Sequence, residues 1–91
     1  MTEFKTVAIL GSGVLGSQIA MQAAYHGKDV TIFDPFQESL DKLPARWDWM
    51  CRGYSEDLSD FSEPKFEDAL SRISTTTELA EAVSDVDIVI E

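Results

Sequence analysis

The 91-residue sequence has few cysteines, few basic side chains and no long hydrophobic run. Its single cysteine, Cys51, cannot form an internal disulfide, so nothing indicates an extracellular location. Only 7 Lys and Arg residues stand against 17 Asp and Glu, and the net charge of −10 disfavours contact with nucleic acid phosphates. No apolar stretch approaches the roughly 18 residues of a membrane span, and the first residues lack the apolar core of a signal peptide. We therefore expect a cytoplasmic domain that binds neither nucleic acid nor membrane.

The residues that are present suffice for one hydrophobic core, because 44% of them are hydrophobic and the length suits a single domain. Short apolar runs that predict strands buried in a parallel sheet lie at residues 7–10, 30–33 and 86–90, and the more polar residues 73–76 predict a further strand. Patterns that predict helices lie between them, at residues 14–26, 36–54, 62–70 and 75–83. This alternation predicts an α/β fold, a Rossmann-type doubly wound parallel sheet that stops after its fourth strand.

Three local features refine the predicted helices. Pro44 interrupts the pattern of residues 36–54 and predicts a kink or two abutting helices there. Residues 55–62 are polar and acidic and predict a loop. Thr75, followed three residues later by Glu78, predicts a capping box that opens the last helix.

A glycine-rich turn joins the first predicted strand to the first predicted helix and has the pattern G-x-G-x-x-G. Gly11 allows a tight turn, Gly13 lets a diphosphate approach the backbone, and Gly16 lets the helix lie close to the sheet. The free N–H groups of the first helical turn, with the positive end of the helix dipole, can hold the anion. The turn therefore predicts a dinucleotide-binding site made of Gly11, Ser12, Gly13, Val14, Leu15 and Gly16.

Asp34 follows the second predicted strand, eighteen residues after Gly16. A carboxylate there can accept hydrogen bonds from both ribose hydroxyls of an adenosine and would repel a 2′-phosphate. Residues 35–37 offer no cation to such a phosphate, so the sequence predicts NAD rather than NADP. The alternative is a structural glycine turn in which Asp34 caps a helix begun by Pro35.

No residue of the sequence is predicted to be catalytic or to bind a metal. His26, the only histidine, falls at the C-terminal end of the first predicted helix, where a cation suits the helix dipole. Cys51 has no histidine nearby in sequence and is expected to be a small buried side chain. Trp47 fits the apolar stripe of its helix, whereas Trp49 is expected to be partly exposed or to pack at an interface.

Three stretches resemble the N-terminal NAD-binding domain of the 3-hydroxyacyl-CoA dehydrogenase superfamily: V-A-I-L-G-S-G-V-L-G-S-Q-I-A, A-Y-H-G-K-D-V-T-I-F-D and T-T-E-L-A-E-A-V-S-D-V-D-I-V-I-E. The resemblance covers residues 5–34 and 72–91 well and the middle loosely. The stretch V-L-G-S-Q-I-A with A-Y-H-G is more similar to the diketoreductase and L-gulonate dehydrogenase branches. The resemblance implies an NAD-dependent oxidoreductase, of a family active in fatty acid metabolism, that moves a hydride between a secondary alcohol and nicotinamide. The glycines of the turn and Asp34 match the family's cofactor-binding positions.

The resemblance further implies that residues 1–91 are a fragment, the first half of the NAD-binding domain plus its fourth strand. The family's catalytic histidine and glutamate lie downstream, with the substrate domain, so the fragment is expected to bind NAD weakly and to have no turnover. The fourth strand would have an open apolar edge, which predicts pairing with a second copy in a homodimer.

The substrate and two other functions stay open. Six acids and one lysine between Glu56 and Asp68 would repel CoA phosphates, which favours a hydroxy or keto acid over a hydroxyacyl-CoA unless Lys42, Arg46 or Arg52 contacts CoA. One alternative function is a non-catalytic module that senses NAD(H) or serves an interaction. The other is a dehydrogenase of the 3-hydroxyisobutyrate or 6-phosphogluconate type.

Overall fold

The computed structural model describes residues 5–57, 63–84 and 86–91. Its elements, in chain order, are β1 (Thr6–Leu10), α1 (Val14–Tyr25), β2 (Asp29–Phe33), α2 (Gln37–Asp41), α3 (Leu43–Asp57), α4 (Glu63–Ser71), β3 (Ile73–Thr76), α5 (Leu79–Val83) and β4 (Ile88–Ile90). No helix within these ranges is both long and apolar enough to cross a membrane.

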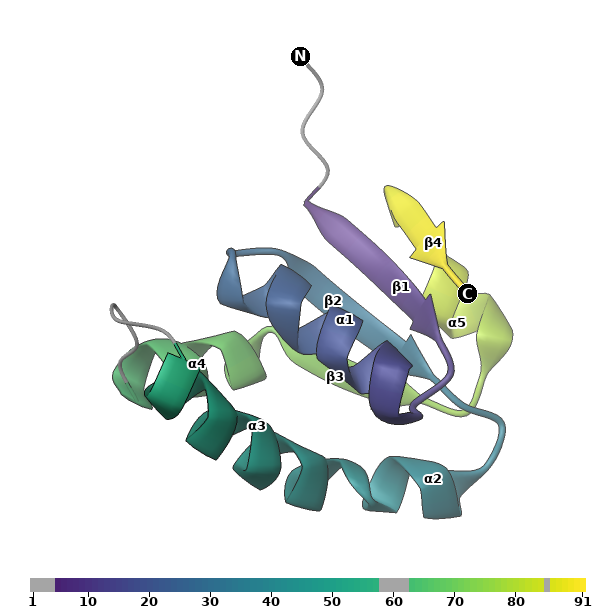
Figure 1. Cartoon of the computed structure of the whole chain (residues 1–91). Coiled ribbons are helices and arrows are strands. Elements are labelled where there is room, and N and C mark those ends of the chain that lie inside the picture. The colour runs from purple at the N-terminus through teal and green to yellow at the C-terminus, as the bar shows by residue number, and fades with distance from the viewer. Residues whose placement is uncertain (1–4, 58–62, 85) are drawn as a thin grey trace.

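The strands form one parallel sheet in the order β3-β2-β1-β4. Helices α1, α3 and α4 pack together on one face and α5 lies on the other (Figure 1). The predicted Rossmann-type α/β fold is therefore confirmed. The chain builds outward from β1 to β3 and then returns to place β4 on the other side of β1, so the order reverses at β1. In such sheets ligands bind at the carboxyl ends of the strands beside this reversal, which is where the β1–α1 turn lies.

The core lies between the sheet and α1. Apolar side chains in the middle of the two central strands are almost completely buried, including Ile9 at 1% and Ile32 at 0% exposure. The buried face of α1 carries small residues such as Ala20 and Ala24, which let the helix lie close to the strands. Burial of each large apolar side chain stabilises the fold by about 1.5–3 kcal/mol, so this packing holds the β1–α1 turn in place.

Most of the predicted elements are present, with corrections at their ends. The break at Pro44 is confirmed: α2 ends at Asp41, and Pro44 lies in the first turn of α3, where its missing N–H costs least. Residues 55–57, predicted as loop, are helical because α3 continues through them, and residues 58–62 lie outside the described residues.

The predicted capping box at Thr75 is wrong, because the N-cap of α5 is Glu78 and no side chain caps it. Thr75 lies within β3, opposite Ile32 of β2. The neighbouring Thr76 instead stabilises the turn before α5: its Oγ1 accepts a hydrogen bond from Glu78 N at 3.0 Å and donates one to Glu81 Oε2 at 2.9 Å. The helix α5 consequently begins only at Leu79.

The fourth strand is shorter than predicted and begins at Ile88. The residue before it, Asp87, contacts the start of β1 through its side chain as well as through its backbone. Its Oδ2 accepts hydrogen bonds from Lys5 N at 2.7 Å and Thr6 N at 3.2 Å. The carboxylate therefore fastens the start of β1 to the segment that leads into β4.

Candidate functional site

The glycine turn is built as its sequence predicts. Gly11 has a φ of +115°, a conformation that favours glycine, and its N–H donates a 2.7 Å hydrogen bond to Phe33 O at the end of β2. A Cβ on Gly16 would overlap the carbonyl oxygen of Gly11 and lie 3.2 Å from its carbonyl carbon. The first turn of α1 is therefore held against the loop in a way that only glycine permits.

The N-terminus of α1 is open. Gly13 is its N-cap and offers no side chain to the free N–H groups, and the first helical bond runs from Ser17 N to Gly13 O at 2.9 Å. A Cβ on Gly13 would meet nothing within 4 Å, and Val14 and Leu15 are 55% and 70% exposed. The helix thus presents unpaired N–H groups and the positive end of its dipole to open space, an arrangement suited to an anion.

Asp34 joins this turn to the end of β2. Its side chain is only 9% exposed, and its Oδ2 accepts hydrogen bonds from Ser12 Oγ at 2.8 Å and Ser12 N at 3.2 Å. Its Oδ1 accepts one from Phe36 N at 3.0 Å. A carboxylate has about four lone-pair positions, so acceptor capacity remains for a ligand hydroxyl. The Ser12 hydroxyl is 1% exposed and serves Asp34, a role that sequence reasoning missed.

The structural alternative for Asp34 is correct in part. The bond from Phe36 N closes a turn of the kind that aspartate side chains favour, and it leads the chain into α2. The helix does not begin at Pro35, however, because Phe36 is the N-cap and Gln37 the first helical residue. Asp34 therefore has a structural role. Because it also lies beside the open end of α1, it can have a ligand-binding role as well.

The Asp34 carboxyl is held in its charged form. Burial opposes the charge, but the hydrogen bonds from Phe36 N, Ser12 Oγ and Ser12 N outweigh it and lower the pKa of Asp34 below its ordinary value. The side chain is therefore an acceptor at neutral pH.

This shift predicts sensitivity to acid. A pKa that is lower in the folded than in the unfolded state stabilises the fold above the unfolded value of about 3.9, and that stabilisation is lost as the pH falls through the folded value. Urea unfolding below pH 4.5 should show a free energy of unfolding that falls less steeply with decreasing pH in Asp34→Asn than in the wild type. Part of the slope should persist in the variant, because backbone N–H groups of Lys5 and Thr6 lower the pKa of Asp87 as well. Equal slopes of the free energy of unfolding against pH in the two proteins would show that the charge of Asp34 does not stabilise the fold.

His26 and Cys51, the other residues considered as functional candidates in the sequence, lie away from the glycine turn. His26 follows the far end of α1, and its Nδ1 lies 2.8 Å from Gln22 O. Cys51 is partly buried, and burial together with nearby acids, Glu63 foremost, raises the pKa of its thiol, which makes it a poor nucleophile. Among the described residues, no group of three or more His, Cys, Asp or Glu side chains is placed to hold a metal ion.

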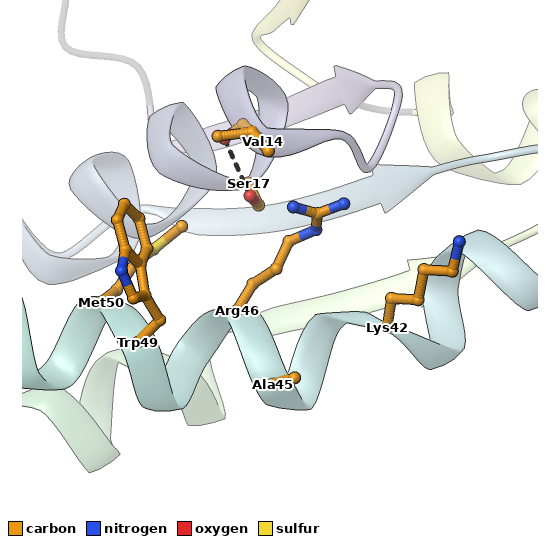
Figure 2. Close-up of a pocket in the computed structure, with 7 residues that line it drawn as sticks. All are labelled: Val14, Ser17, Lys42, Ala45, Arg46, Trp49 and Met50. Carbon is orange, nitrogen blue, oxygen red and sulfur yellow. Dashed lines mark hydrogen bonds between the residues drawn. The ribbon is translucent and has the colours of Figure 1, made fainter.

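A pocket beside the turn was not predicted. It has a volume of about 490 Å³, lies between α1 and α3, and is lined by Val14, Ser17, Lys42, Ala45, Arg46, Trp49 and Met50 (Figure 2). Trp49 is 55% exposed at its rim, as expected from its position off the apolar stripe, while Trp47 packs against the core. A sequence pattern could not reveal this pocket, because it arises from the packing of α3 across α1.

A family model described as "3-hydroxyacyl-CoA dehydrogenase, NAD binding domain" matches residues 6–91. The chain belongs to the 3-hydroxyacyl-CoA dehydrogenase family. The resemblance seen in the sequence is confirmed, and so is its cofactor, because the matching domain is the family's NAD-binding domain.

Individual relatives agree with this family. The NAD-binding domain is 32% identical over 98 residues to the mitochondrial hydroxyacyl-coenzyme A dehydrogenase of Sus scrofa, an alignment that covers 96% of this chain and 29% of that protein. Among solved structures, a diketoreductase studied for its catalysis on dicarbonyl compounds matches with 38% identity and a TM-score of 0.87, over 98% of this chain and 31% of the other. The 3-hydroxybutyryl-CoA dehydrogenase of Escherichia coli matches with 27% identity and a TM-score of 0.82. That match covers 97% of this chain and 18% of the other. The chain thus spans less than a third of the length of these relatives.

Proposed function

We propose that the glycine turn and Asp34 hold NAD, the turn its diphosphate and Asp34 its adenosine ribose. The observation that carries this proposal is the hydrogen bonding of Asp34 to Ser12, which puts a charged acceptor beside the open N-terminus of α1. The N-terminus of α1 would recognise the diphosphate of NAD, and the Asp34 carboxylate would recognise the two hydroxyls of its ribose. The residues proposed to form this site, by contact with NAD or by holding a residue that contacts it, are Gly11, Ser12, Gly13, Val14, Leu15 and Gly16, together with Asp34.

Each residue has a distinct part in holding the cofactor. The open space before Gly13 admits a diphosphate to the backbone, and the unpaired N–H groups of α1 neutralise it without any lysine or arginine. Ser12 positions the Asp34 carboxylate rather than touching the ligand, since its hydroxyl is buried. NAD, when bound, supplies the hydride acceptor or donor at its nicotinamide ring.

The whole protein is proposed to be an NAD-dependent oxidoreductase acting on a 3-hydroxyacyl or related hydroxy or keto acid. Family membership and the names of the relatives support this, as does the 38% identity to a diketoreductase. The acid–base step of alcohol oxidation needs a group such as a histidine near the substrate, and His26 lies at the far end of α1 from the turn. We therefore assign that step to residues outside these 91.

A homodimer and a cytoplasmic location stay predictions. The half-exposed Val89 on β4, at 43%, is consistent with a strand edge that pairs with a second copy. The pig relative is named as a mitochondrial enzyme, so relatives do not favour the cytoplasm in particular.

Calorimetric titration with NAD and with NADP tests the proposal. We expect NAD to bind at least about 10-fold more tightly, because the charged Asp34 side chain would repel a 2′-phosphate and residues 35–37 supply no cation. Tighter binding of NADP, or no binding of either dinucleotide, would overturn it.

A further inference from the structure

We propose that the pocket between α1 and α3 binds the free carboxylate of a small hydroxy or keto acid, with Arg46 and Lys42 as its cationic partners. This inference rests on the proposed dehydrogenase function and names the substrate class that the function leaves open. A volume of about 490 Å³ is in the range of small-molecule sites. The pocket also lies against Val14, beside the turn proposed to hold NAD, so its occupant would be a neighbour of the cofactor.

The two cations of the pocket lack a negative partner. Figure 2 shows Arg46 extending from α3 toward α1, with its guanidinium beside Ser17. No acidic residue of the described part of the chain is among those that line the pocket. Within residues 5–57, 63–84 and 86–91, neither Arg46 nor Lys42 forms an ion pair, and Arg46 Nε is buried without a hydrogen-bond acceptor. A buried guanidinium N–H without an acceptor lowers stability, and a bound anion would relieve that cost.

The position of Arg46 beside α1 strengthens this requirement. Val14 and Ser17, which line the pocket with it, belong to the first turns of α1, where the helix dipole is positive. A cation beside the positive end of a helix is unfavourable unless an anion lies between them. The guanidinium and the ammonium group of Lys42 therefore favour a negatively charged occupant of the pocket, while the N–H groups at the end of α1 are left to the proposed diphosphate.

The rest of the lining favours a short carboxylic acid over a nucleotide or a CoA thioester. Val14, Ala45, Trp49 and Met50 give the pocket apolar walls, which suit a few carbon atoms attached to one charge. A carboxylate also matches the planar fork of arginine.

The surrounding charge argues in the same direction. Exposed acids on α3 and α4, such as Asp48, Glu56 and Glu67, face any ligand that approaches along these helices. Their repulsion grows with the charge of the ligand, so several phosphate groups are opposed more than one carboxylate.

Binding of two matched probes to the protein tests the inference. Acetoacetate carries the carboxylate, and methyl acetoacetate has the same carbon skeleton without the charge. A Trp47→Phe background leaves Trp49, at the rim of the pocket, as the only tryptophan, so its fluorescence reports occupancy. We expect acetoacetate to change this fluorescence in a saturable way, and the ester to bind at least 10-fold more weakly.

Variants of α3 locate the charge that matters. Arg46→Met keeps most of the apolar stem and removes the guanidinium, and it should weaken acetoacetate binding at least 10-fold, whereas Arg46→Lys should restore part of it. Arg52→Met is the matched control, because Arg52 is an exposed arginine of the same helix outside the pocket lining. Unchanged acetoacetate binding in Arg46→Met, or equal binding of the ester, would overturn the inference.

Calorimetry with NAD separates the possible sources of the anion. An unchanged NAD affinity in Arg46→Met supports a substrate carboxylate, whereas an equal loss of NAD and acetoacetate affinity assigns Arg46 to the cofactor diphosphate and overturns the inference. A stronger dependence on Arg46 for acetoacetyl-CoA than for acetoacetate overturns it as well, in favour of CoA phosphates. If the wild type binds NAD but not acetoacetate, only this inference fails; if it does not bind NAD, the proposed function fails.

Discussion

Replacing Gly16 by alanine is expected to lower the free energy of unfolding by about 1–3 kcal/mol and to abolish detectable binding of NAD. The added Cβ would overlap the carbonyl oxygen of Gly11, and a backbone atom cannot move aside as a flexible side chain can. Either α1 shifts away from the loop or the turn opens, and both change the direction of the N–H groups at the start of α1. Urea unfolding and NAD calorimetry on the same preparation measure the two effects.

Gly53→Ala is the matched control for this substitution. Gly53 lies inside α3, and a Cβ there would meet nothing within 4 Å. Alanine in a helix is more favourable than glycine by roughly 0.5–1 kcal/mol, so this variant should be slightly more stable than the wild type and bind NAD equally well. A Gly16→Ala protein as stable as Gly53→Ala, with normal NAD binding, would contradict the close approach of α1 to the turn.

Replacing Asp34 by asparagine is expected to weaken NAD binding by about 10- to 100-fold and to narrow the preference for NAD over NADP. Hydrogen bonds to a charged acceptor are worth about 1.5–3 kcal/mol, and the substitution removes that charge from the proposed ribose contact. It also removes the repulsion of a 2′-phosphate, so NADP should lose less affinity than NAD, or gain some. Calorimetric titration with both dinucleotides measures the change in their ratio.

Asp29→Asn controls for the loss of one negative charge from the same strand. Asp29 is the first residue of β2 and is exposed, whereas Asp34 follows the last residue of that strand. The control should leave both affinities unchanged. Thermal unfolding of Asp34→Asn separates lost binding from lost structure, since Ser12 and Phe36 also bond to this side chain. An unaltered ratio of NAD to NADP affinity in a folded Asp34→Asn protein would rule out the proposed ribose contact.

Features encoded by short stretches of sequence were predictable. The strands β1 and β2 are short and largely apolar, and the turn between β1 and α1 needs glycine at positions that the pattern marks directly. The break at Pro44 follows from one missing N–H. In each case the cause lies within a few residues of the effect, so the order of elements and the place of the glycine turn could be derived without coordinates.

Features that depend on distant packing were missed. The hydroxyl of Ser12 turns inward because Asp34, which follows β2, accepts a 2.8 Å hydrogen bond from it. Thr75 cannot cap α5 because the sheet register places it within β3, opposite Ile32, and the helix begins without a side-chain cap. The pocket with Arg46 exists only because α3 packs across α1, and no spacing along the chain indicates that contact.

The most direct test of the central claim is to follow the backbone amide resonances of the protein by NMR during titration with NAD. The largest shifts are expected at residues 13–16, where free N–H groups meet a diphosphate, and at Asp34 and Ser12, where the carboxylate that Ser12 N–H holds meets a ribose. Shifts confined to other surfaces, with residues 12–16 unmoved at saturating NAD, would contradict the claim.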